Sequence, residues 1–246
     1  MFQPTLQTKA NGMPVISSSE LDVLGERMLA DFSPLAPIIP QEVDIDRFLL
    51  KHLGMKQDFH YLSHCGVYLG MTVFQTTHRL PVYNPALKRA EYVYAEAGTI
   101  IIDSSLAEEA QEHRYRFTVG HECAHAILHT SYFLNTIGSI KENAIPYVRC
   151  RADYGSSVET PNLKNSQIWT DERRAEQQAN RLCSAILMPK SAVRILIAKI
   201  PKSGSLQWTH AATEQVSKTF NVSTQAAFYR LKELGFIESQ QVLAHI

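Results

Sequence analysis

Residues 121–125 read His-Glu-Cys-Ala-His, an H-E-x-x-H motif, within a segment whose apolar residues recur at helical spacing. Positions i and i+4 of an α-helix lie one turn apart on the same face, so His121 and His125 can bind one metal ion together. Glu122 projects about 100° round the helix from His121, which suits a general base better than a ligand. The chain must therefore bury a long helix that carries two imidazoles on its apolar face.

A third metal ligand is expected, because catalytic zinc usually has three protein ligands and one open position. The strongest other helical pattern covers residues 171–188, and Glu176 interrupts its apolar stripe beside the small Ala179. A carboxylate in a buried stripe must be neutral, paired or metal-bound, which favours Glu176 as the third ligand. Glu172 in the first turn stays open as a rival, and Cys183 as an alternative soft ligand.

Composition limits the class of protein. Lys plus Arg and Asp plus Glu number 24 each among 246 residues, and 45% of residues are apolar, which excludes wholesale disorder. No apolar run is long enough to span a membrane, and no C-x-x-C pair indicates a zinc knuckle or redox dithiol. The first residues lack the basic and apolar stretches of a secretory signal, so we expect a cytoplasmic protein with reduced thiols.

The remaining pattern predicts a mixed, α+β fold. Helices are expected, in chain order, at 18–32 with Ser19 as N-cap, 44–53, 105–128 with a Ser105/Glu108 capping box, 171–188 and 191–200, and as a pair within 208–236 joined at 221–223. Strands are expected at 66–74 with one buried face, at 92–94, and at 99–102 with both faces covered. These elements predict three regions, namely an N-terminal helical region at 1–54, a metal-binding core at 55–200 with an irregular insertion at 130–167, and a helix-turn-helix-like region at 201–246.

Other polar residues are expected to have structural rather than catalytic roles. His129 lies a further turn along the helix, where we expect packing or a hydrogen bond to a ligand. Arg116 is either an ion-pair partner near the site or solvated. The C-terminal helix pair offers few basic residues, Lys218, Arg230 and Lys232, and DNA binding normally needs several phosphate contacts. A structural or partner-docking role is therefore favoured over DNA binding.

Two linked motifs suggest a family. Arg116-Phe117 precedes His121-Glu122-x-x-His125, and Glu176-x-x-Ala179-Asn180 is followed by Ile186-Leu187-Met188-Pro189. This combination resembles the ImmA/IrrE-like metallopeptidases, most strongly from about residue 100 to 189. The interval from His125 to Glu176 is 51 residues, longer than in compact members.

The resemblance implies a zinc-dependent endopeptidase with His121, His125 and Glu176 as ligands and Glu122 as catalytic base. It also implies a small zincin-like core, in which a few-stranded sheet packs on the H-E-x-x-H helix and the second ligand helix. Family members are associated with cleaving helix-turn-helix repressors of mobile elements, so such a repressor is the implied substrate. Manganese or iron also suits a His/His/Glu site.

Several points stay open at this stage. The donor that stabilises the oxyanion is one of Tyr132, Tyr147, Tyr154 or His129. A substrate is expected to add as a strand to an exposed edge near residues 67–74. The main alternative is a non-catalytic, metal-containing regulator that binds a protein partner or DNA, and a further one is a metal-dependent hydrolase acting on something other than peptides.

Overall fold

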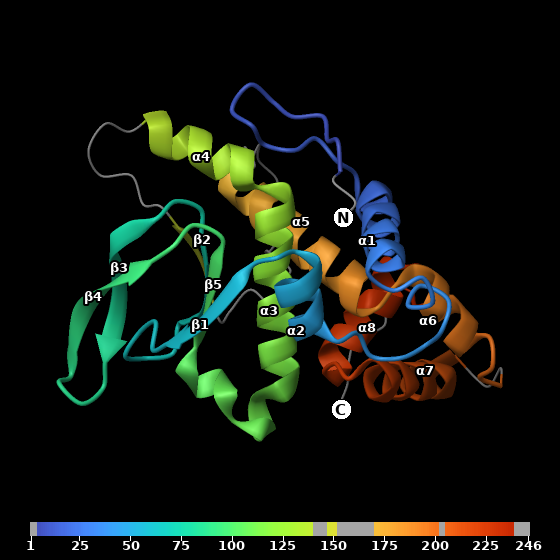
Figure 1. The fold of residues 1–246 in the computed structure, drawn as a ribbon. Helices are drawn as coiled ribbons and strands as arrows, with labels where there is room; N and C mark the ends of the chain where they lie inside the picture. Colours follow the sequence, from blue (N-terminus) through green and yellow to red (C-terminus); the bar gives the residue numbers. More distant parts are fainter. Residues whose placement is uncertain (1–3, 140–146, 152–169, 202–204, 239–246) are drawn as a thin grey trace, which may run out of the picture.

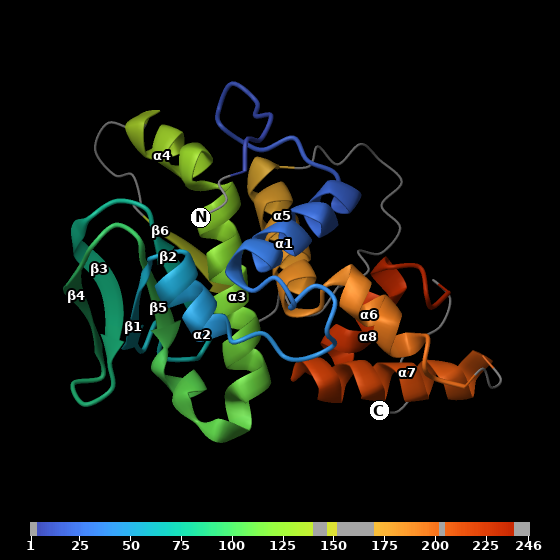
Figure 2. The same cartoon turned by 45° about the vertical axis from the view of Figure 1, so that its right-hand side comes forward.

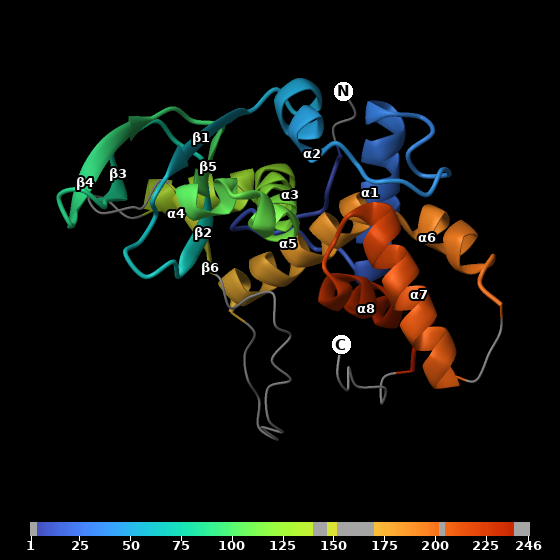
Figure 3. The ribbon, with the colours of Figure 1, turned by 90° about the horizontal axis from the view of Figure 1, so that it is seen from below.

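The computed structural model describes residues 4–139, 147–151, 170–201 and 205–238. Small β-sheets lie at one end of the molecule and the C-terminal helices at the other, with two long helices between them (Figures 1 and 3). The chain is thus an α+β protein, as the sequence pattern predicts.

A four-stranded sheet lies against the central helix. Its order is β1-β5-β2-β6, with β1 parallel to β5 and the other neighbours antiparallel. A separate hairpin, β3-β4, covers its other face. The strands are β1 (Lys56–His60), β2 (Tyr68–Val73), β3 (Thr77–Asn84), β4 (Arg89–Ala95), β5 (Thr99–Asp103) and β6 (Tyr147–Arg151).

Strand β2 differs from its expected position in two ways. It is not an exposed edge, because it pairs with β5 on one side and β6 on the other. It is also buried on both faces, since Met71 and Val73 pack against the hairpin while Gly70 and Thr72 contact the central helix. The expected docking of a substrate strand along 67–74 is therefore wrong.

Eight α-helices and short helical turns complete the described chain. The central pair is α3 (Glu112–Leu128) and α5 (Asp171–Leu187), which pack together (Figure 2). The others are α1 (Ser18–Phe32), α2 (Ile45–Arg47) with a π-helical turn at Phe48–His52, 3₁₀ turns at Ser104–Ala107 and Glu109–Gln111, α4 (Thr130–Ser139), α6 (Lys190–Ile197), α7 (Ser205–Phe220) and α8 (Thr224–Glu233).

Two predicted caps are wrong. Helix α1 is capped by Ser17, not Ser19, and Glu20 completes its capping box. The predicted Ser105/Glu108 box does not form, because Asp103 at the end of β5 accepts the Ser105 backbone N–H and starts a 3₁₀ turn instead. Helix α3 begins only at Glu112.

The segment 130–167 is not irregular where the structure describes it. Helix α4 follows α3 directly, and its Tyr132 joins a small apolar cluster with Met13 and Ala175. Strand β6 forms by pairing with β2. Both elements depend on partners distant in sequence, which local periodicity does not reveal. Residues 140–146 and 152–169, including Tyr154, lie outside the described residues.

One continuous apolar core joins the three predicted regions. It contains Leu29 and Phe48 from the N-terminal region, Val119 from the central region, and Phe220 and Leu231 from the C-terminal region. Arg116 adds to this connection, since its guanidinium donates to the backbone carbonyls of Val43, Phe220 and Asn221. The expected ion-pair or solvated role of Arg116 is thus replaced by a structural one.

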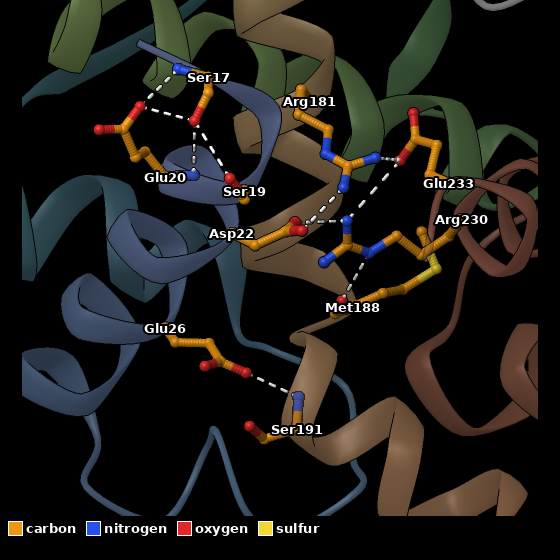
Figure 4. Close-up of polar contacts among 10 residues, drawn as sticks. All are labelled: Ser17, Ser19, Glu20, Asp22, Glu26, Arg181, Met188, Ser191, Arg230 and Glu233. Atoms are coloured by element: carbon orange, nitrogen blue, oxygen red, sulfur yellow. Dashed lines mark hydrogen bonds and ion pairs between the residues drawn. The ribbon is translucent and has the colours of Figure 1, made fainter. Parts of the chain in front are cut away.

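An ion cluster in which Asp22 and Arg230 are buried links three helices (Figure 4). Asp22 of α1 lies 2.7 Å from Arg181 of α5 and 2.7 Å from Arg230 of α8. Arg230 also donates to the carbonyl of Met188, and Arg181 pairs with Glu233. Two cations and two anions balance within the cluster, which limits the cost of burying Asp22 and Arg230.

No helix among the described residues has the length and apolar content that crossing a membrane would require.

Candidate metal centre

Helix α3 carries the H-E-x-x-H residues at the centre of the molecule. His121, Glu122 and His125 are each 0% exposed. The two histidines lie on the same face, with their Nε2 atoms 2.9 Å apart. This is the arrangement expected from residues four apart on a helix.

Helix α5 brings Glu176 to the two histidines. The approach is close because Ala179 is small and because Gly120 has no side chain, since a Cβ there would lie 2.9 Å from Cys183 Sγ. Glu176 Oε2 lies 3.2 Å from His121 Nε2, and Glu176 Oε1 lies 3.4 Å from His125 Nε2. The predicted third ligand is thus placed beside the first two.

These three side chains fit a divalent cation. Each offers one ligand atom, and the three atoms lie within 4.8 Å of one another. Glu176 Oε2 is buried; His121 Nε2 lies 3.2 Å from it, but no donor among the described residues makes a well-aligned hydrogen bond to it. A buried carboxylate without such a donor is costly unless a cation compensates it, so the group could bind a metal ion.

Burial sets the charge states at the site. Burial lowers the pKa of His125 despite the nearby carboxylate of Glu176, so the imidazole is neutral and able to bind a metal. Burial opposes ionisation of Glu176, but contacts with His121 and His125 outweigh it and hold the pKa of Glu176 well below its usual range. A neutral His125 imidazole beside an ionised Glu176 carboxylate supplies donors of the kinds found in many zinc sites.

Glu122 is outside this three-ligand group. Its carboxylate lies against β2, where the Thr72 hydroxyl donates to Glu122 Oε2 and lies 3.2 Å from the Glu122 carbonyl. Gly70 leaves space for it, because a Cβ at that position would lie 2.6 Å from Glu122 Oε1. Strand β2 therefore fixes the position of the expected general base.

Other hydrogen bonds orient the ligand histidines. His121 Nδ1 lies 2.8 Å from Asn180 Oδ1, and His125 Nδ1 lies 3.1 Å from His129 Nδ1. The expected hydrogen-bonding role of His129 is confirmed. Burial lowers the pKa of His129 to about 3, so this imidazole is neutral.

The rival ligands lie elsewhere. Glu172 is exposed in the first turn of α5. Cys183 contacts the backbone of Phe117 and the Gly120 position. Among the described residues the only group arranged for a metal is His121, His125 and Glu176.

Two of the four candidate oxyanion donors are engaged elsewhere in the fold. Tyr132 packs in the Met13 cluster, and His129 uses both ring nitrogens in hydrogen bonds. Tyr147 lies on β6, where the structure describes the backbone alone.

Three functional candidates were not apparent from the sequence. Gly70 and Thr72 alternate with the apolar Met71 and Val73, so the sequence shows that they lie on the opposite face of the strand. It does not show that this face contacts Glu122. Gln178 looks like an ordinary helix residue until the fold places it beside His129.

Neither the models of known protein families nor the curated proteins contain a match to this sequence.

Proposed function

We propose that this chain is a zinc-dependent endopeptidase that resembles the ImmA/IrrE-like metallopeptidases, with a zincin-like core formed by the sheet, α3 and α5. The observation that carries the proposal is the convergence of His121, His125 and Glu176, with the Glu122 carboxylate of α3 held against strand β2 by Thr72. A purely structural metal has no need of an H-E-x-x-H glutamate beside three protein ligands, whereas a hydrolase uses it as a base.

In this proposal, the residues of the site have distinct roles in metal binding and proton transfer. His121, His125 and Glu176 would hold the ion, which when bound lowers the pKa of water and polarises the carbonyl of the scissile bond. Glu122 accepts the proton of the attacking water and donates it to the leaving amine. Thr72 and Gly70 keep the Glu122 carboxylate in one position throughout.

Burial of the site favours a second candidate function. His121, Glu122 and His125 are all 0% exposed, so water and substrate reach Glu122 only after neighbouring groups move. A metal-containing regulator that binds a partner without cutting it needs no such movement. That regulator is therefore the alternative to test.

The C-terminal helices support a partner-docking role more than DNA binding. Of their three basic residues, Arg230 is 1% exposed and Lys218 pairs with Glu214. Too few cations are left to neutralise several phosphates. A protein substrate, by resemblance a helix-turn-helix repressor, is the proposed partner of this cytoplasmic enzyme.

The experiment compares Glu122→Gln with the wild type. Both proteins are analysed for bound metal by elemental analysis and incubated with a panel of proteins that includes helix-turn-helix repressors. We expect zinc in both, and cleavage by the wild type alone, because glutamine keeps the shape of Glu122 but accepts no proton. The loss should exceed about 100-fold, the lower range for general-base catalysis.

Two controls separate the alternatives. A chelator should stop cleavage by the wild type, and added zinc should restore it. Equal cleavage by Glu122→Gln would overturn the mechanism. Zinc binding and partner binding without any cleavage would instead favour the non-catalytic regulator.

A further inference from the structure

His129 lies in the interior without being placed to bind the metal. It caps the C-terminus of α3 and is 0% exposed. Its Nδ1 lies 3.1 Å from His125 Nδ1, and its Nε2 lies 3.1 Å from Gln178 Oε1. A buried imidazole with both nitrogens engaged has its proton position decided by its partners.

The direction of these hydrogen bonds follows from one backbone carbonyl. Gln178 Nε2 donates to the carbonyl of Pro14 at 3.1 Å, and a carbonyl only accepts. Gln178 therefore presents its amide oxygen to His129, so His129 Nε2 must carry the proton. A neutral His129 then accepts at Nδ1, and the donor to it is the Nδ1–H of His125.

These hydrogen bonds also decide the state of His125 Nε2, the atom that would bind the metal. With its proton on Nδ1, neutral His125 has a lone pair on Nε2, the atom that faces Glu176 Oε1 and His121 Nε2. The amide oxygen of Asn180 accepts the Nδ1–H of His121, which leaves a lone pair on His121 Nε2. Both lone pairs are thus directed at the place where a cation would lie.

We propose that His129 is a positioning residue of the metal centre, which together with Gln178 and the Pro14 carbonyl fixes His125 in the tautomer that binds metal through Nε2. This inference rests on the metal centre of the proposed function and adds to it a chain of hydrogen bonds that ends outside α3 and α5.

The chain ends on the N-terminal arm, residues 4–16, which runs past α4 and α5 (Figure 2). Lys9 and Asn11 both bind Asp171 at the start of α5, at 2.5 and 2.8 Å. Met13, next to Pro14, is 0% exposed. These contacts hold the Pro14 carbonyl in place, so the arm contributes to the geometry of the metal centre.

The test replaces His129 in two ways. His129→Phe fills the space but accepts no hydrogen bond, so zinc affinity, measured by competition with a chromophoric chelator, should fall about 10–100-fold. His129→Gln has one acceptor for His125 and one donor for Gln178, so it should retain most of the affinity. The matched control is His52→Phe, which replaces an imidazole 8% exposed among Phe32 and Phe48 and should bind zinc as the wild type does.

A second readout reports the tautomer itself. In the zinc-loaded wild type, NMR of labelled imidazoles should show a slowly exchanging Nδ1–H on His125. This proton resonance should persist in His129→Gln and be lost from His129→Phe. Gln178→Leu, which alters the chain from its other end, should weaken zinc binding in the same direction.

The outcomes distinguish the two proposals. Wild-type zinc affinity in a folded His129→Phe, or an unchanged His125 resonance, would overturn the positioning role. If His129→Phe does not fold, a Gln178→Leu protein with wild-type affinity overturns it equally. Weakened zinc binding in these variants, combined with full cleavage by Glu122→Gln, would support the positioning role and reject the peptidase mechanism.

Discussion

At Gly70, the absence of a side chain decides where Glu122 can lie. A Cβ there would be 2.6 Å from Glu122 Oε1 and 2.7 Å from Thr118 Cγ2. The backbone of Gly70 is not in the left-handed region, so space alone explains the glycine.

Gly70→Ala should therefore displace the Glu122 carboxylate while leaving the three metal ligands in place. A shift of about 1 Å in a catalytic group can reduce turnover about 100-fold. Elemental analysis should still find the metal, and urea unfolding should show a loss of about 1–3 kcal/mol from overpacking. Thr118→Ser in the same background relieves only the contact with Thr118, so restored activity in the double variant would contradict displacement of Glu122.

The buried histidines make the metal-free protein sensitive to acid. The pKa of His129 is about 3 in the folded protein, against 6.5 for an ordinary histidine. The unfolded chain then binds a proton that the folded protein does not, so stability falls as the pH decreases from about 6.5 towards 3.

Between pH 7.5 and pH 5, this single group should reduce the free energy of unfolding by about 2 kcal/mol. His129→Gln removes the titrating group. Its free energy of unfolding should therefore decrease by about 2 kcal/mol less than that of the wild type between pH 7.5 and pH 5. Urea unfolding of the chelator-treated proteins at both pH values measures the difference. Parallel pH dependence in the two proteins would show that His129 does not titrate in this way.

At the scale of elements, the ion cluster of Figure 4 joins α1, α5 and α8. Asp22 is 4% exposed and binds both Arg181 and Arg230. Removing its charge leaves two guanidinium groups with one carboxylate, that of Glu233, between them.

Asp22→Asn should thus lower the free energy of unfolding by about 3–5 kcal/mol, the range for breaking a buried ion pair. The control is Glu214→Gln, which breaks the exposed pair with Lys218 and should cost less than about 1 kcal/mol. Urea denaturation of the three proteins provides the comparison. Similar small losses in both variants would mean that the cluster does not hold the helices together.

The elements differ in how far local sequence determines them. Helices α1 and α5 follow the predicted ranges closely, because their apolar residues repeat every three to four positions over several turns. Strands β1, β3 and β6 were not predicted. β1 shows a mostly exposed pattern and forms by parallel pairing with β5, which lies about 40 residues later in the chain.

At the scale of the whole molecule, one apolar core extends from α1 through α3 and α5 to α7 and α8. A shared core favours a single unfolding transition. Because this core contains residues from all three predicted regions, we expect the regions 1–54, 55–200 and 201–246 to unfold together.

In a Trp169→Phe background, which removes a tryptophan outside the described residues, Trp208 alone reports on α7. Its fluorescence and the far-UV circular dichroism should give coincident urea transitions. Free zinc at 100 times its dissociation constant should add about 2.7 kcal/mol, and a chelator should remove that gain from both signals. Loss of the Trp208 signal at lower urea, independent of zinc, would instead show that the C-terminal helices unfold on their own.

The sequence by itself determined those features of the site that depend on residue spacing within a single helix. Spacing of four residues placed His121 and His125 on one face, and the apolar stripe of α5 singled out Glu176 as a carboxylate that needed a partner. Periodicity carries this information because a helix converts short sequence intervals into fixed distances.

Only the tertiary structure decided what surrounds those residues. The hydrogen bonds of Thr72 with Glu122 and of Gln178 with His129 each join residues about 50 positions apart in the chain. The hydrogen bond from Gln178 to Pro14 joins residues about 160 positions apart. No local pattern encodes such contacts, because they arise when separate elements bury their apolar faces together and the enclosed polar groups must find hydrogen-bond partners.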